Sequence, residues 1–271
     1  MLNKGGHFFF QKNRETNKQF FNSGILKNSK GQLTIFIIII VFIIGIAIVF
    51  FALRSQIGKK EVVTPEIEPI KYFVENCIEE AGNEIVYSVG QGGGYLFPPE
   101  FSTASGIPYY YSNGKNYMPS KNQMESEIST FVNLKIFFCT KNFIDFPEFE
   151  IEQGEPKTET KILDDKIILN VNYPLSIKMG LSTSLIKEFN NIEIPVRFGI
   201  IYDSIDKIIK EQLSHESICL SCILDISLKN DLFVNMLDYD EETTIFIVRD
   251  ENSQINKKPF EFIFSNKYKL K

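Results

Sequence analysis

Residues 33–53, LTIFIIIIVFIIGIAIVFFAL, form an apolar run of 21 residues without a charged side chain. At the helical rise of about 1.5 Å per residue, such a run reaches across the roughly 30 Å hydrocarbon core of a bilayer. A cleaved secretory signal would have an apolar core of only about 7–15 residues, followed by small residues. The sequence therefore predicts a retained transmembrane helix at 33–53.

The charges on either side of this run predict its orientation. Residues 1–30 contain six basic residues and a single acidic one, and only three basic residues follow the run closely, at Arg54, Lys59 and Lys60. The whole chain has a net charge of −5, so the part beyond residue 30 carries −10. Because basic flanks stay in the cytoplasm, we expect a single-pass protein of the cell membrane with residues 1–32 inside and the carboxy-terminal part outside.

The residues directly before the run resemble a known processing signal. Lys30-Gly31-Gln32-Leu33-Thr34 is similar to the class III signal peptide of archaeal type IV pilin-like proteins, in which a basic leader ends in Lys-Gly. This resemblance implies cleavage between Gly31 and Gln32. Pilins usually have Glu at the fifth mature position, where this chain has Phe36. A processed pilin-like subunit and an intact cytoplasmic tail therefore both remain open.

A second resemblance covers most of the chain. VENCIEE at 74–80, GQGGGYLFPPE at 90–100 and a following helix that closes at Cys139 resemble uncharacterised single-pass membrane proteins that are common in small-genome archaea. The resemblance implies an anchored protein and brings no known activity.

After a linker at 54–66, the pattern predicts a helical segment at 67–145. Apolar residues recur at steps of three and four between about 65 and 89, including Ile70, Val74 and Cys77, which is typical of one helix face. Ser120 with Gln123 three residues later resembles a capping box, and an apolar stripe continues from there to Phe138. We expect these two helices to pack together.

Residues 146–271 have a different period and are expected to form an extracytoplasmic domain. Apolar residues alternate at 167–177, after a turn at 163–166, and further strands are predicted at 192–198, 231–237, 243–249 and 259–265. A helix is expected at 202–213 and a shorter one near Ser217. Grouped strands with interspersed helices indicate an α+β fold with a mainly antiparallel sheet.

The four cysteines are the most suggestive chemical groups. Cys77 and Cys139 lie on the two helices expected to pack together, and Cys219 and Cys222 form a CxxC motif. An even number of cysteines outside the cell favours two disulfides, whereas four small buried side chains are the alternative. The CxxC could also exchange thiols if Cys219 begins a helix. We expect no cofactor and no metal. A tetrahedral zinc site needs four ligands, and the CxxC with His215 supplies only three. A site made of all four cysteines is the alternative.

Three other patterns are better explained by structure than by function. The glycines at 90–94 follow a helix and indicate its end, and the acidic cluster at 238–242 indicates a hairpin turn more than a calcium site. The run Tyr109-Tyr110-Tyr111 is expected to pack under a loop, with an exposed binding surface as the alternative.

The sequence predicts a cell-surface protein with a binding or structural role. The acidic balance argues against a nucleic-acid partner, and the residues of a hydrolytic site are not recognisable. Its expected partners are the lipid bilayer and other surface proteins, while a small-molecule ligand is left open. The alternatives are a pilin-like subunit, a membrane-tethered thiol-disulfide oxidoreductase and a solute-binding ectodomain.

Overall fold

The computed structural model describes residues 37–48, 65–215 and 218–268. The chain divides into two compact units, residues 1–60 and 61–271. Within these described ranges, no helix combines the length and apolarity needed to cross a membrane. Residues 33–36 and 49–53 of the predicted span lie outside the described residues, as do Gly31 and Gln32 of the predicted cleavage site.

The first unit contains helix 37–48, whose sequence is IIIIVFIIGIAI. All twelve of its residues are exposed, and Phe42 has an exposed fraction of 70%. A helix that is apolar on every side has no face that prefers water.

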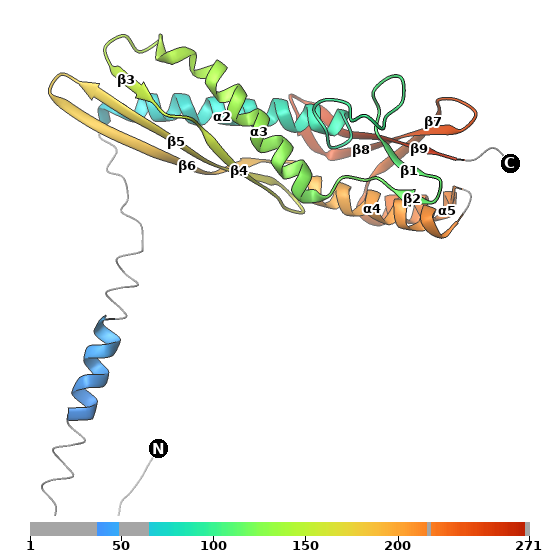
Figure 1. Cartoon of the computed structure of the whole chain (residues 1–271), viewed down its shortest axis with the longest axis horizontal. Coiled ribbons are helices and arrows are strands. Elements are labelled where there is room, and N and C mark those ends of the chain that lie inside the picture. Colours follow the sequence, from blue (N-terminus) through green and yellow to red (C-terminus); the bar gives the residue numbers. More distant parts are fainter. Residues whose placement is uncertain (1–36, 49–64, 216–217, 269–271) are drawn as a thin grey trace, which may run out of the picture. The chain divides into compact units, whose positions relative to one another are not determined.

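The second unit is an α+β fold with mainly antiparallel strands, as predicted, and it contains two sheets (Figure 1). In the first sheet the strand order is β2-β1-β9-β8-β7, and β1 pairs with β9 in parallel while the other pairs are antiparallel. Its strands are β1 (Tyr109–Ser112), β2 (Lys115–Asn116), β7 (Phe233–Asp238), β8 (Thr243–Ile255) and β9 (Lys258–Lys267).

The second sheet is built around one long hairpin. Strand β5 pairs with β6 along its whole length, and with β3 and β4 one after the other. The break between β3 and β4 lies opposite Pro174, whose carbonyl accepts a hydrogen bond from the amide of Gly154 at 2.8 Å. Proline has no N–H to donate, so the ladder is interrupted there. The strands are β3 (Glu150–Gln153), β4 (Lys157–Ile162), β5 (Ile167–Met179) and β6 (Ser182–Ile194).

Helix α2 (Glu68–Gln91) joins the two sheets into one core. At Gly82 the helix lies against Leu169 and Ile194 of the second sheet, and at Gly90 it lies against Phe260 of β9 in the first sheet. A side chain at either glycine would collide with these residues, so the absence of a Cβ permits the close packing. The short η1 (Pro65–Ile67) precedes α2.

The second predicted helix is α3 (Lys121–Thr140), followed by η2 (Lys141–Phe143). Its capping box is present: the amide of Gln123 donates to Ser120 Oγ at 3.3 Å, and the amide of Ser120 donates to Gln123 Oε1 at 2.7 Å. Two backbone N–H groups that have no partner within the helix are thereby hydrogen-bonded, which explains why α3 begins here.

Two further helices, α4 (Phe198–Ser214) and α5 (Leu220–Asn230), complete the unit. Phe198 of α4 packs on Phe260 and Phe262 with ring centroids 5.8 and 5.6 Å apart. Only residues 192–194 of the strand predicted at 192–198 belong to β6, which begins ten residues earlier at Ser182. The prediction was wrong for Phe198, which begins α4. Most of β6 carries exposed polar residues because it is an edge strand, so its sequence does not alternate clearly.

The tyrosine run packs into the core. Tyr110 is fully buried, stacks on Phe264 with ring centroids 4.8 Å apart, and donates its hydroxyl to the carbonyl of Gly93 at 2.8 Å. Burial raises the pKa of the Tyr110 hydroxyl well above its usual value. Tyr111 is buried as well, so these side chains support the fold and do not form a binding surface.

Candidate functional site

The structure contains both predicted disulfides. Cys77 of α2 pairs with Cys139 of α3, with their Cα atoms 5.8 Å apart, and Cys219 pairs with Cys222, with Cα atoms 5.3 Å apart. Because the sequence has four cysteines, no thiol is left free. The first disulfide connects the two packed helices near the start of α2, the end at which the chain arrives from residue 64.

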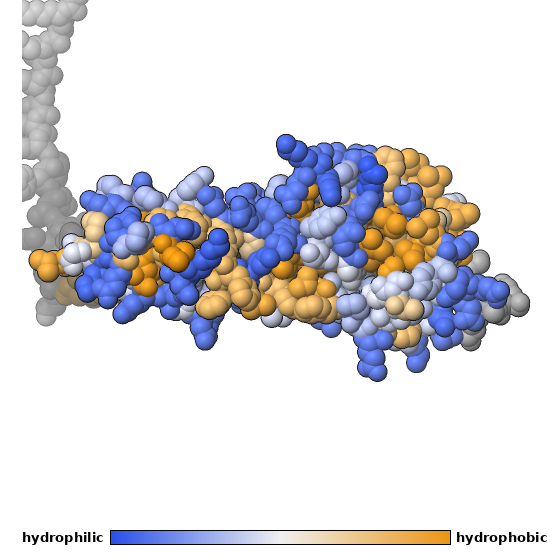
Figure 2. Space-filling view, turned by 90° about the horizontal axis from the view of Figure 1, so that it is seen from above, coloured by the Kyte–Doolittle hydropathy of each residue, from blue (hydrophilic) through white to orange (hydrophobic). Residues whose placement is uncertain are grey.

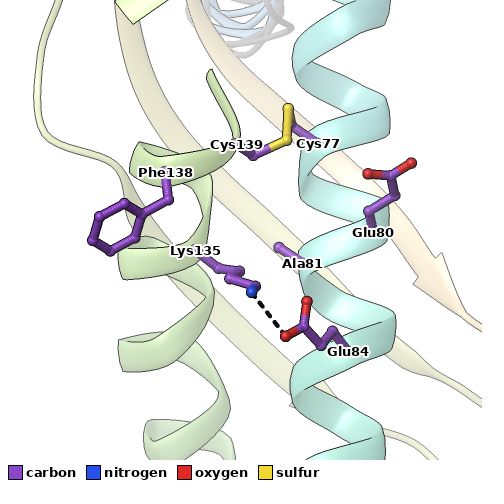
Figure 3. Close-up of a pocket in the computed structure, with 7 residues that line it drawn as sticks. All are labelled: Cys77, Glu80, Ala81, Glu84, Lys135, Phe138 and Cys139. Carbon is purple, nitrogen blue, oxygen red and sulfur yellow. Dashed lines mark ion pairs between the residues drawn. A yellow bond between two sulfur atoms is a disulfide. The ribbon is translucent and has the colours of Figure 1, made fainter. Parts of the chain in front are cut away.

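A groove of about 270 Å³ lies between α2 and α3 beside the first disulfide (Figure 3). Lys135 reaches across it to Glu84, with Nζ and Oε1 2.8 Å apart, and Phe138 is among the residues that line it. Pockets for small ligands usually measure about 300–1,000 Å³. The groove is therefore small and already crossed by an ion pair, which gives little support to a solute-binding site.

The CxxC disulfide lies at the start of α5. Cys219 is the N-cap residue, and its sulfur accepts a hydrogen bond from the amide of Cys222 at 3.3 Å. Glu211 Oε2 lies 4.0 Å from Cys222 Sγ and 3.9 Å from His215 Nε2. A helix start favours a thiolate, but a carboxylate beside the sulfur disfavours it. The surroundings therefore do not consistently favour thiol exchange.

The two disulfides differ in their effect on the unfolded chain. Chain-entropy theory assigns about 4 kcal/mol to the cross-link between residues 77 and 139, which are 62 positions apart. The same relation gives about 2 kcal/mol for Cys219 and Cys222, only 3 positions apart. The first disulfide is thus the main covalent support of the domain, and the second fixes the start of one helix.

The other sequence patterns have structural roles. The glycines after residue 90 end α2, and Gly93 and Gly94 have φ angles of +57° and +84°, which favour glycine. The acidic cluster forms the turn between β7 and β8, where the amide of Glu242 donates to Asp240 Oδ1 at 2.9 Å and lowers the pKa of that carboxyl. In the described part of the chain, no three His, Cys, Asp or Glu side chains are grouped to hold a metal ion.

The first sheet exposes an apolar surface that sequence reasoning missed (Figure 2). On β7, Phe233 and Leu237 have exposed fractions of 55% and 52%, and their sheet face continues onto β8 and β9. The sequence contained a signal for it: β7 is apolar at both alternating sets of positions apart from Asn235 and the terminal Asp238. We call this surface the distal sheet face. Its apolar members are the exposed Phe233 and Leu237 and the half-buried Ile245, Ile247 and Ile263, and the polar residues Asn235, Arg249 and Glu261 share the face.

The distal sheet face lies far from the start of α2. Helix α2 begins beside the second sheet and reaches the first sheet only at Gly90, near its other end. With 24 residues it is about 36 Å long.

No family model matches the chain, and comparisons with curated proteins and with solved structures found no significant match.

Proposed function

We propose that this chain is a single-pass membrane protein whose disulfide-stabilised α+β domain lies outside the cytoplasm and binds another protein. The observation that carries this proposal is that all four cysteines are paired in two disulfides. Disulfides persist in oxidising surroundings and are rare in the cytosol, where thiols are kept reduced. The paired cysteines therefore support an outer position for the domain that holds them.

Two features support the anchor. Helix 37–48 exposes apolar side chains on every side, and the charge-free run around it extends from residue 33 to 53. The basic amino terminus and the acidic remainder agree with an orientation that places residues 61–271 outside. The disulfides and the charges thus lead independently to the same topology.

The distal sheet face supports a binding role. Uncovered apolar faces of this kind mark interaction sites more often than isolated apolar residues do. It lies at the opposite end of the domain from residue 65, where η1 begins.

The negative charge beside the distal sheet face indicates which kind of protein would bind there. The turn at 238–242, which contains four carboxylates, borders the distal sheet face. A protein with an apolar centre and a basic rim complements this surface. A second copy of the chain would bring one acidic turn toward another.

The topology can be tested with single introduced thiols, since the native cysteines are paired. Lys187 is exposed on β6, and Lys18 lies in the basic amino terminus. We expect a membrane-impermeant maleimide to label Lys187→Cys in intact cells and to label Lys18→Cys only after permeabilisation. The reverse pattern, or release of the protein from membranes by alkaline carbonate, would contradict the proposal.

The binding surface can be tested with a photoreactive residue at Leu237 in native membranes, with the same residue at Lys187 as the matched control. We expect a discrete adduct with a different protein from position 237 only. Its yield should fall several-fold at high salt and in the variant Asp240→Lys with Glu241→Lys, because both weaken contacts to a basic rim. An adduct of dimer mass would show self-association instead, and equal yields at both positions would refute a specific surface.

A further inference from the structure

We propose that the end of the domain at which α2 begins inserts apolar side chains into the interfacial region of the bilayer. The residues that make this contact are Tyr72, Ile144, Met179 and Leu181, which we call the proximal tip. This inference rests on the proposed membrane anchor, and it adds a second attachment: the domain lies against the lipid instead of standing free on its linker.

Three segments that are distant in sequence meet at this end of the domain. Phe73, in the second turn of α2, packs against Phe143 and Phe146 with ring centroids 6.2 and 5.2 Å apart, so the loop that contains Ile144 lies beside the start of α2. The same loop leads into β3, whose Glu150 pairs with Lys178 of β5. The hairpin turn that carries Met179 and Leu181 follows directly.

The hairpin extends beyond the start of α2 (Figure 1). Leu169 touches α2 at Gly82. From that level the helix continues for about 21 Å back to Glu68, whereas β5 continues for roughly 40 Å to the turn. The turn is therefore the outermost part of the domain on the side where the chain arrives from the anchor.

The proximal tip exposes large apolar side chains, which are usually buried in a soluble domain. Leu181 is completely exposed, at 106%, and the exposed fractions of Ile144 and Tyr72 are 73% and 67%. Turn positions in soluble hairpins are usually polar. The turn needs a residue with positive φ, and Gly180 supplies it with a φ of +60°. Nothing in the fold requires leucine at the next position. Large apolar residues on three converging segments are explained if lipid covers them.

The linker between the predicted span and η1 is short enough to keep the proximal tip close to the bilayer. Residues 54–64 separate the predicted span from η1, and eleven residues reach at most about 40 Å. Such a short link gives the proximal tip a high effective concentration at the bilayer surface. Leucine and methionine suit the region below the head groups, while tyrosine is typical of the interface itself.

The charges near the proximal tip determine which lipid it fits. Lys178 pairs with Glu150 at 2.7 Å, and Lys71 pairs with Glu75 at 3.6 Å. The same segments also carry Lys141 against Glu68, Asp145 and Glu148. With no excess of basic residues, attraction to anionic head groups does not drive the contact. The apolar side chains do, so a neutral phosphatidylcholine bilayer is sufficient and the contact is insensitive to salt.

The test uses full-length protein reconstituted into phosphatidylcholine vesicles. A nitroxide at Leu181→Cys reports collisions with oxygen, which partitions into lipid, and with a water-soluble nickel chelate. A nitroxide at Leu237→Cys on the distal sheet face is the matched control. We expect the oxygen-to-nickel collision ratio to be several-fold higher at 181 than at 237, and to be unchanged at high salt.

A second variant separates lipid contact from local structure. With the nitroxide at Ser182→Cys, adding Leu181→Asp should lower the collision ratio to the value of the control, whereas adding Leu237→Asp should leave it unchanged. If the protein resists carbonate extraction but positions 181 and 237 give equal ratios, the proximal tip does not contact lipid while the anchor stands. If carbonate removes the protein from the vesicles, the proposed anchor itself fails.

Discussion

Replacing Arg197 by alanine is expected to destabilise the domain by about 3–5 kcal/mol, because it leaves the carboxylate of Asp250 buried without its counter-charge. Asp250 is fully buried in β8. Arg197 Nε donates to Asp250 Oδ2 at 3.0 Å, and Arg197 Nη2 donates to Oδ1. The hydrogen bonds to Asp250 also raise the pKa of Arg197, so the guanidinium stays charged.

Arg197 additionally connects separate elements of the fold. Its guanidinium donates to the carbonyls of Asn230 and Asp231 at 3.3 and 3.2 Å, where α5 ends. The backbone N–H of Asn252 donates to Asp250 Oδ1 at 3.0 Å within the irregular part of β8. The substitution thus disrupts the junction of α4, α5 and β8 at once, which places the expected effect toward the upper part of the range.

Urea or thermal unfolding followed by circular dichroism measures this effect. For a domain of this size, 1 kcal/mol shifts the melting temperature by about 2–4 °C, so a decrease of roughly 6–20 °C is expected. Lys210→Ala is the matched control, because its ion pair with Asp206 is on the surface and such pairs contribute at most about 1 kcal/mol. Equal losses in the two variants would show that the Arg197–Asp250 pair has no special role.

The sequence predicts the features that depend on local pattern. Helix α3 begins where its capping box requires, and the periodicity of α2 places Cys77 on the buried side of the helix, facing α3. The CxxC pairing follows because residues three apart at a helix start are close in any fold. These features involve residues that are near one another in sequence, or helices whose apolar stripes require a partner.

The remaining features depend on pairings between distant residues. Tyr111 of β1 pairs with Asn266 of β9, more than 150 positions away, and neither strand has a pattern that selects the other. The same is true of Arg197 and Asp250, which are ordinary charged residues until the fold brings them together. The exposure of a side chain also depends on residues distant in sequence. Leu181 and Phe233 are of residue types that are usually buried, and only the arrangement of their neighbours in the fold leaves them exposed.

Removing the disulfide between α2 and α3 is the second change with a large expected effect. The double variant Cys77→Ala with Cys139→Ala should lose about 4 kcal/mol, because the unfolded chain regains the freedom of a loop that the disulfide otherwise closes. This corresponds to a decrease in melting temperature of roughly 8–16 °C. Cys77 is 3% exposed, and alanine leaves no unsatisfied polar group at its position, so the measured loss is chiefly that of the cross-link.

The matched control is Cys219→Ala with Cys222→Ala, for which the shorter loop predicts a loss of about 2 kcal/mol. Both double variants should be compared with the native protein in the presence and absence of reductant. Reductant should lower the melting temperature of the native protein and of the Cys219 and Cys222 variant, and it should change the Cys77 and Cys139 variant least. If the two double variants are equally stable, chain entropy is not the basis of the effect. A larger loss from the CxxC would give the start of α5 a more important role in the fold than its position suggests.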